Sequence, residues 1–280
     1  MTMRTVAIAG VGLIGGSFAL ALRKAGFTGT ILGVSSAATL DTALRLGVID
    51  CGTSLDDALA RADLVYLAQP IGRILDSLPR IGELARPGTL ITDAGSTKSK
   101  IVSAAARSIR RAQFIGGHPI AGKETRGVEA AVSALFEDRT YILTPTGPSE
   151  LDTPAAREFI EWLTRIRARV LCISPERHDE LVALTSHLPQ LAANGLAALL
   201  GERLYNADDR MAAGPGLLDT TRLALSSYDI WRDILATNRE HIDAALAAYI
   251  EALNSIRCGL GAGDLEPAFR AGAQFREQIH

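Results

Sequence analysis

The chain has 280 residues, of which 48% are hydrophobic and 21% charged, and its formal net charge at pH 7 is −2. This composition predicts a soluble globular protein that is long enough for two domains. Balanced charge without long basic or acidic runs argues against a nucleic-acid partner, and no apolar stretch is long enough to predict a membrane span.

The cysteines Cys51, Cys172 and Cys258 stand far apart and show no C-x-x-C spacing. This argues against a zinc site and against a disulfide framework, so we expect no metal. The first residues pass directly into an apolar strand pattern without the features of a signal peptide. The sequence therefore predicts a reducing, cytoplasmic location.

The first predicted strand, residues 4–9, runs into the sequence GVGLIGGS and then into a helix-forming segment. Its glycines match the G-x-G-x-x-G pattern, in which the first allows a tight turn, the second lets a pyrophosphate approach and the third lets the helix pack on the strand. The start of the helix offers unpaired N–H groups to a diphosphate. The predicted cofactor site in this turn comprises Gly10, Gly12, Leu13, Ile14 and Gly15.

The second predicted strand, residues 30–34, ends beside Ser35 and Ser36. An NAD-dependent enzyme usually carries an acidic residue here, which binds the ribose and repels the extra phosphate of NADP. That acid is missing, but no arginine stands beside the serines to bind the phosphate. We therefore predict that the cofactor is NADP or NAD, with a preference for NADP.

Strands and helices continue to alternate along the chain. Strands are predicted near residues 63–68, 89–92, 113–115, 141–144 and 170–173, and helices near 55–62, 73–85, 98–110 and 154–166. This order predicts a Rossmann-type, doubly wound parallel sheet whose ligands bind beyond the carboxyl ends of its strands. Pro70 and Ser96 follow such strand ends, although Ser96 could instead cap the helix that comes next.

The segment FIGGHPIAGKETRG, residues 114–127, places His118 between a glycine pair and a proline. So much Gly and Pro is unusual in a helix or a central strand, so we expect a stiff loop. An unperturbed imidazole titrates at about pH 6.5, which makes His118 a candidate for taking a proton near neutral pH. The alternative is a hydrogen-bonded structural histidine.

After Ser174 no strand pattern remains, which predicts a dinucleotide-binding domain of residues 1–173 and an all-α domain of residues 174–280. Ser174 is placed to cap a helix that begins at Pro175. Within that helix the sequence SHLPQ sets His187 and Gln190 around a proline that should perturb the backbone.

Further along, GPGLLDTTR contains Arg222, whose guanidinium can bind a carboxylate through two hydrogen bonds. An ion pair with Asp219 or another acid is the alternative. From Ile230 we expect one long helix with an apolar seam, which favours a homodimer through the helical domain. Packing of the seam within the domain is the alternative. The tail, residues 264–280, predicts one more amphipathic helix.

The motifs GVGLIGGS, DAGSTK, GGHPIAGKE, TSHLPQ and GPGLLDTTR, with YDIWRDI after them, occur in this order along nearly the whole chain. Together they resemble the prephenate and arogenate (cyclohexadienyl) dehydrogenases of tyrosine biosynthesis. The resemblance implies oxidative decarboxylation of prephenate or arogenate with hydride transfer to NAD(P)+, giving 4-hydroxyphenylpyruvate or tyrosine. The substrate would be a small molecule.

The resemblance also implies roles for particular residues. His118 matches the histidine that accepts the proton of the substrate hydroxyl, and Ser96 the serine that orients it. The matching substrate-binding residues are His187, Gln190, Arg222 and Glu124. The chain departs from the family at Gln190, where prephenate-specific members often carry a histidine, and at Leu218, where a lysine is common. Arogenate or dual use is therefore our expectation.

Two other functions are alternatives. β-Hydroxyacid dehydrogenases share a dinucleotide domain followed by helices but use a catalytic lysine in the helical part, and the segment from Ser174 onward contains no lysine. An NAD(P)-binding sensor without catalysis would keep the glycine turn but has no need to combine His118, Ser96 and Arg222.

Overall fold

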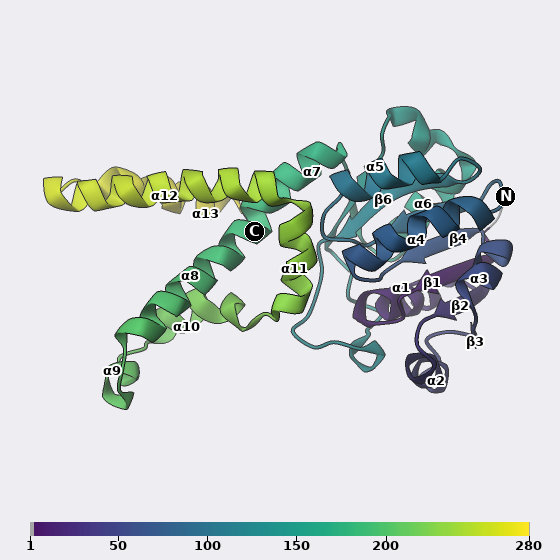
Figure 1. Ribbon diagram of the computed structural model, residues 1–280, viewed down its shortest axis with the longest axis horizontal. Coiled ribbons are helices and arrows are strands. Elements are labelled where there is room, and N and C mark those ends of the chain that lie inside the picture. Colours follow the sequence, from purple (N-terminus) through teal and green to yellow (C-terminus); the bar gives the residue numbers. More distant parts are fainter. Residues whose placement is uncertain (1–2, 280) are drawn as a thin grey trace. The chain divides into compact units, whose positions relative to one another are not determined.

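The computed structural model describes residues 3–279, which divide into two compact units (Figure 1). The first contains the chain up to Val182 together with Leu225–Thr237, and the second contains Ala183–Ala224 and the chain from Asn238 onward. The domain boundary expected after residue 173 stays a prediction.

The first unit holds an eight-stranded sheet with the strand order β3-β2-β1-β4-β5-β6-β7-β8. The strands are β1 (Thr5–Ala9), β2 (Thr30–Val34), β3 (Cys51–Gly52), β4 (Leu64–Leu67), β5 (Leu90–Asp93), β6 (Gln113–Pro119), β7 (Thr140–Thr144) and β8 (Arg169–Cys172). All pairs from β3 to β6 are parallel, whereas β7 runs antiparallel to β6 and β8 parallel to β7. The predicted doubly wound α/β fold is confirmed, with its last two strands reversed.

Helices lie on both faces of this sheet in Figure 1. The helices of the first unit are α1 (Leu13–Lys24), α2 (Ala37–Arg45), α3 (Leu55–Arg61), α4 (Ile71–Leu84), α5 (Ser99–Ser108), α6 (Pro154–Arg165), α7 (Pro175–Val182) and α11 (Tyr228–Thr237), with 3-10 turns at Val128–Ala130 and Pro148–Asp152. On β1, Val6 and Ile8 belong to the apolar cluster that includes α1 and α6, while Ala7 and Ala9 belong to the cluster that includes α3, α4 and α5. Successive side chains of a strand point to opposite faces, so a strand that is apolar throughout is covered on both sides.

The prediction of a loop around His118 is wrong, because this residue lies on β6, between β5 and β7. Glycine is required at residues 116 and 117 of this strand, because neighbouring groups leave no room for a side chain. A Cβ on Gly117 would lie only 2.6 Å from the carbonyl oxygen of Asp93. Pro119 cannot donate to a ladder and is the last residue of the strand. Close packing in the sheet therefore holds His118 near the carboxyl end of β6.

Among its described residues the second unit contains helices and no strand. It comprises a π-helical turn (Ala183–His187), α8 (Leu188–Arg203), α9 (Ala207–Met211), α10 (Pro215–Thr221), a 3-10 turn (Arg222–Leu225), α12 (Arg239–Ala262) and α13 (Glu266–Gln278). The π-helical turn directly precedes α8, which has Pro189 in its first turn, so the expected perturbation of the backbone is confirmed. At residues 3–279 no helix combines the length and the apolar character needed to cross a bilayer.

A single long helix from Ile230 is not what the structure contains, because the chain breaks between α11 and α12 at Asn238. Asn238 leaves the helical conformation, with φ −124° and ψ 27°. Its side chain makes hydrogen bonds to His187 and His241. Asparagine competes for hydrogen bonds in this way more readily than most helix-forming residues, and the apolar periodicity on either side of it does not reveal the break.

Candidate active site

The glycine turn joins β1 to α1 as the sequence predicts. Gly10 has a φ of +96°, in the region that glycine favours. A Cβ at Gly15 would lie 2.1 Å from the Gly10 carbonyl oxygen, whereas a Cβ at Gly12 would meet nothing within 4 Å. The turn is thus closed where the helix packs on the strand and open where a diphosphate would approach. Leu13 and Ile14 begin α1, and no described side chain caps its N-terminus.

A pocket of about 470 Å³ opens beside this turn and is lined in part by Gly10, Gly12, Ser35, Ser36 and Pro70. Ser36 caps the N-terminus of α2, where its Oγ accepts the backbone N–H of Thr39 at 3.4 Å. Among the described residues that line the pocket, none has a charged side chain. The open approach at Gly12 and the N–H groups at the start of α1 fit a dinucleotide. The lining supplies neither an acid for a ribose nor a cation for a phosphate.

His118 is half-buried and takes part in a chain of hydrogen bonds with two residues of α7. Its Nδ1 lies 2.8 Å from Nε2 of His178. Nδ1 of His178 in turn lies 2.8 Å from Oδ1 of Asp179. The side chains of His178 and Asp179 are both completely buried. Burial lowers the pKa of His178, although the hydrogen bond to Asp179 opposes this shift.

The Asp179 carboxylate lies at the N-terminus of α5. Its Oδ1 accepts the backbone N–H of Lys98 at 2.7 Å, and its Oδ2 accepts that of Ser99 at 2.9 Å. Burial acts to raise the pKa of Asp179, but the hydrogen bonds from His178 and from these two N–H groups outweigh it and lower the pKa. A helix N-terminus favours a carboxylate, so Asp179 is an ionised group with a fixed position.

Lys98 and Asp93 form a completely buried ion pair next to this chain. Lys98 Nζ also donates to the carbonyl oxygen of Gly117 at 2.8 Å, and Asp93 accepts the backbone N–H of Gly117 at 3.1 Å. Burial lowers the pKa of Lys98, and the nearby Asp93 carboxylate opposes this shift. The pair ties the end of β5 to the residue that precedes His118.

The other candidate residues of the first unit are Ser96 and Glu124. Ser96 is half-buried in the segment between β5 and α5. It does not cap α5, because that helix begins at Ser99 and its first N–H groups bind Asp179. The alternative prediction for Ser96, that it caps the following helix, is therefore wrong. Glu124 is exposed in the segment that follows β6.

The helical unit brings His187 and Gln190 into its own hydrogen-bond network. His187 is buried, and its Nδ1 lies 3.3 Å from the side-chain nitrogen of Asn238. The Gln190 amide nitrogen donates to Asn194 Oδ1 at 2.6 Å and to the carbonyl oxygen of Leu223 at 2.7 Å. Gln190 thereby fixes the 3-10 turn in which Arg222 stands exposed.

Comparison with known protein families gives a match for each of the two parts of the chain. Residues 18–172 match the prephenate dehydrogenase nucleotide-binding domain, and residues 174–274 match the prephenate dehydrogenase dimerization domain. The chain belongs to the prephenate dehydrogenase family. It is an oxidoreductase of the prephenate/cyclohexadienyl dehydrogenase type, with a nucleotide-binding part and a dimerization part.

Individual relatives agree over nearly the full length. The prephenate dehydrogenase of Bacillus subtilis is 39% identical over 95% of this chain and 72% of its own. The cyclohexadienyl dehydrogenase of Zymomonas mobilis is 31% identical over 92% of this chain and 89% of its own. The crystal structure of prephenate dehydrogenase from Aquifex aeolicus, in complex with hydroxyphenyl propionate and NAD+, is 31% identical, covers 100% of this chain and 99% of its own, and has a TM-score of 0.90.

The sequence analysis did not predict four residues that lie close to His118: Asp93, Lys98, His178 and Asp179. The first two stand in the DAGSTK motif, from which only Ser96 was singled out, and a lysine beside a strand end was a usable signal. His178 and Asp179, near the start of the helix that Ser174 caps, were not predicted as site residues. Among residues 3–279 no group of three or more His, Cys, Asp or Glu side chains is placed to hold a metal ion.

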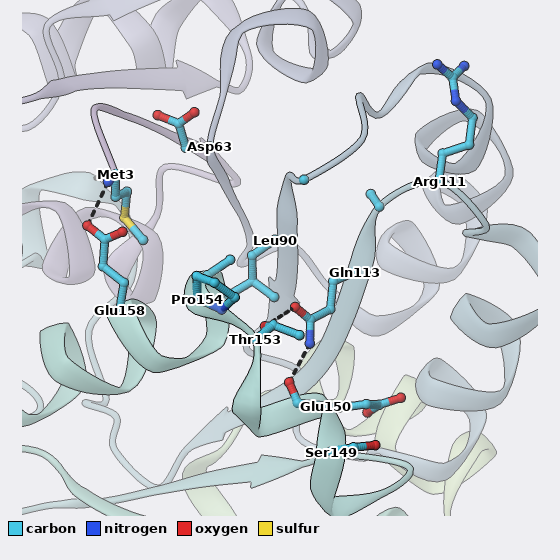
Figure 2. A pocket seen from close by; sticks show the side chains of 13 residues that line it. Met3, Asp63, Leu90, Arg111, Gln113, Ser149, Glu150, Thr153, Pro154 and Glu158 are labelled. Atoms are coloured by element: carbon cyan, nitrogen blue, oxygen red, sulfur yellow. Dashed lines mark hydrogen bonds between the residues drawn. The ribbon is translucent and has the colours of Figure 1, made fainter. Parts of the chain in front are cut away.

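A larger pocket of about 690 Å³ lies at the opposite edge of the sheet, where Leu90 and Gln113 begin β5 and β6 (Figure 2). Within it, Gln113 donates to the Glu150 carbonyl oxygen and accepts the Thr153 hydroxyl at 2.6 Å. In doubly wound dehydrogenases the ligand edge is the other one, so this pocket is not the active site.

Proposed function

We propose that the protein oxidatively decarboxylates prephenate, arogenate or both, with hydride transfer to NAD(P)+, giving 4-hydroxyphenylpyruvate or tyrosine. The observation that carries this proposal is the position of His118. It stands near the carboxyl end of β6 in the same compact unit as the open glycine turn, and its hydrogen bond to His178 of α7 prepares it to accept a proton. Family membership supplies the substrate class.

His118 is the general base in this proposal. It accepts the proton of the ring hydroxyl while the bound nicotinamide accepts hydride from the carbon that carries it, and carbon dioxide leaves as the ring becomes aromatic. Aromatisation supplies a large driving force, so the protein has to position the reacting carbon and remove one proton. Ser96, near the end of β5, orients the imidazole or the hydroxyl.

Four residues are assigned to substrate binding. Arg222 binds the side-chain carboxylate, His187 donates a hydrogen bond, and Glu124 belongs to the same set. Gln190 contributes through its hold on the Leu223 carbonyl. Because Gln190 and Leu218 replace a histidine and a lysine that are common among prephenate-specific members, we propose use of arogenate or of both substrates.

For the cofactor, the uncharged lining of the pocket supports acceptance of NADP as well as NAD, with a preference for NADP. No carboxylate repels the phosphate at Ser35 and Ser36. Ser36→Asp should lower kcat/KM with NADP about tenfold relative to NAD, because a carboxylate would face the added phosphate. A Thr42→Ala variant, at a half-buried position of α2 outside the pocket lining, is the matched control.

A homodimer through the helical part is the proposed assembly. The helical part matches a dimerization domain, and α12 and α13 leave several large apolar side chains exposed in the single chain: Ile250, Leu253, Ile256, Leu260, Phe269 and Phe275. A sedimentation or light-scattering mass of one chain at micromolar concentration would contradict this assembly.

The deciding experiment incubates the protein with prephenate or arogenate and with NAD or NADP, and follows the absorbance of the reduced cofactor. Reduction in at least one of the four combinations supports the proposal. The absence of reduction in all four, in a protein that still binds the cofactor, would favour a nucleotide sensor without catalysis.

A further inference from the structure

We propose that His178 and Asp179 are positioning residues that hold His118 in the tautomer with a proton on Nδ1 and a lone pair on Nε2. This inference rests on the proposed role of His118 as the general base. The chain of contacts runs from the N-terminus of α5 through α7 to β6, and each link fixes the direction of the next.

The direction is set at Asp179. Its oxygens accept the backbone N–H groups of Lys98 and Ser99, which can only donate. An ionised carboxylate has no proton to give, so the contact between Asp179 Oδ1 and His178 Nδ1 requires the proton to be on His178. A neutral His178 then carries its lone pair on Nε2.

The hydrogen bond between His178 and His118 then determines the tautomer of His118. His178 Nε2 lies 2.8 Å from Nδ1 of His118, so Nδ1 of His118 has to donate. The Nε2 of a neutral His118 is consequently the nitrogen that can take a proton from a substrate. The T-shaped arrangement of the two rings, with centroids 5.1 Å apart, adds a packing contact that resists rotation of His118.

Burial, aided by one nearby cation, favours the neutral form of His178. Asp93 and Asp179 favour its protonated form, while burial and the Lys98 cation oppose it. Burial is the largest of these effects and the pKa of His178 is lowered. A protonated His178 would donate to both neighbours and force His118 to present Nδ1 as the acceptor. The buried Lys98–Asp93 pair thus belongs to the same arrangement, since its cation lies near His178.

The first test needs no substrate, and it uses variants only to assign the resonances. The protein is labelled with ¹⁵N-histidine, and the nitrogen shifts and proton couplings of His118 are measured near pH 7.5, with the resonances assigned by single substitutions of the five histidines. The expected spectrum shows Nδ1 protonated and Nε2 unprotonated in His118. A spectrum dominated by the Nε2-protonated form would overturn the proposal.

The second test compares two amides at position 178. In His178→Gln the amide oxygen can occupy the place of Nε2 and still accept from His118, whereas the shorter amide of His178→Asn can serve only the Asp179 side. We expect His178→Asn to lower kcat about thirtyfold with KM changed less than twofold, and His178→Gln to lower kcat about threefold. Arg177→Ala, on the exposed side of the same helix, should leave both constants unchanged.

A purely structural role predicts a different pattern. Equal losses in the two amide variants, with the His118 spectrum unchanged in both, would contradict the relay. If His178→Asn does not fold, the wild-type spectrum still decides the question. The spectrum is recorded on the protein without substrate, so a failure of the relay stays distinct from a failure to reduce any cofactor.

Discussion

Each compact unit contains a network that links two histidines, and the networks differ in the group that sets their direction. In the first unit the Asp179 carboxylate stands at the end of the chain and can only accept, which leaves His118 as a proton acceptor. In the second unit the Asn238 amide stands in the middle, with its nitrogen toward His187 and its oxygen 2.8 Å from Nδ1 of His241.

The difference gives the two histidines opposite polarity. The Asn238 nitrogen can only donate, so Nδ1 of His187 accepts and a neutral His187 carries its proton on Nε2. His187 is thus suited to donate to a substrate oxygen, while His118 is suited to take a proton. A carboxylate at the end of one network and an amide in the middle of the other therefore distinguish the proposed base from the proposed binding residue.

The largest expected effect comes from removing the base itself. His118→Ala should lower kcat/KM about a thousandfold, within the range that general bases contribute, with cofactor affinity little changed. In the wild type, kcat/KM should fall on the acid side, because only the neutral imidazole can accept a proton. Both are measured by cofactor absorbance across pH. A loss smaller than tenfold, or a flat profile, would remove the distinction between His118 and His187.

The next largest effect is expected from removing the Lys98 cation, which is paired with Asp93 beside the first network. Lys98→Met leaves the Asp93 carboxylate buried without its partner, which should lower the free energy of unfolding by about 3 kcal/mol. Urea unfolding measures the loss. Adding Asp93→Asn should recover part of the stability, since the uncompensated charge is then gone. Additive losses would show that the two side chains do not act as a pair.

Removing the amide from the second network tests the polarity of His187. In Asn238→Leu nothing from residue 238 donates to His187 Nδ1, so the donor on Nε2 is no longer favoured. We expect KM for the substrate to rise about fivefold, the equivalent of one hydrogen bond, with kcat nearly unchanged. Ser255→Ala, on the exposed face of α12, is the control. A fall in kcat with constant KM would instead give His187 a role in proton transfer.

The smallest expected effect is on acid stability. Because the pKa of His178 is lowered in the folded protein, the unfolded chain binds its proton at a higher pH. Stability should therefore fall as the pH drops below about 6.5, the ordinary value for histidine. His178→Gln should lose less Tm than the wild type between pH 7.5 and 5.5. An equal loss would mean that His178 is already protonated in the folded state.

The sequence alone determined the fold class and the strongest candidates for the cofactor turn and the base. Glycine spacing after a first strand, alternation of apolar segments and the motif around His118 are local patterns, and turn geometry and side-chain periodicity act over a few residues. The same locality explains two errors. The glycines of β6 and the asparagine between α11 and α12 take their conformations from neighbours that are distant in the chain.

Only the tertiary structure brought His178 to His118 and Asp179 to the start of α5. These pairs are 60 and 81 residues apart in the chain. Their hydrogen bonds depend on how α7 packs against α5 and β6, and such packing follows from the burial of whole apolar faces, which no short motif encodes. The sequence therefore specified that a histidine would stand at this edge of the sheet, and the fold decided which of its nitrogens faces inward.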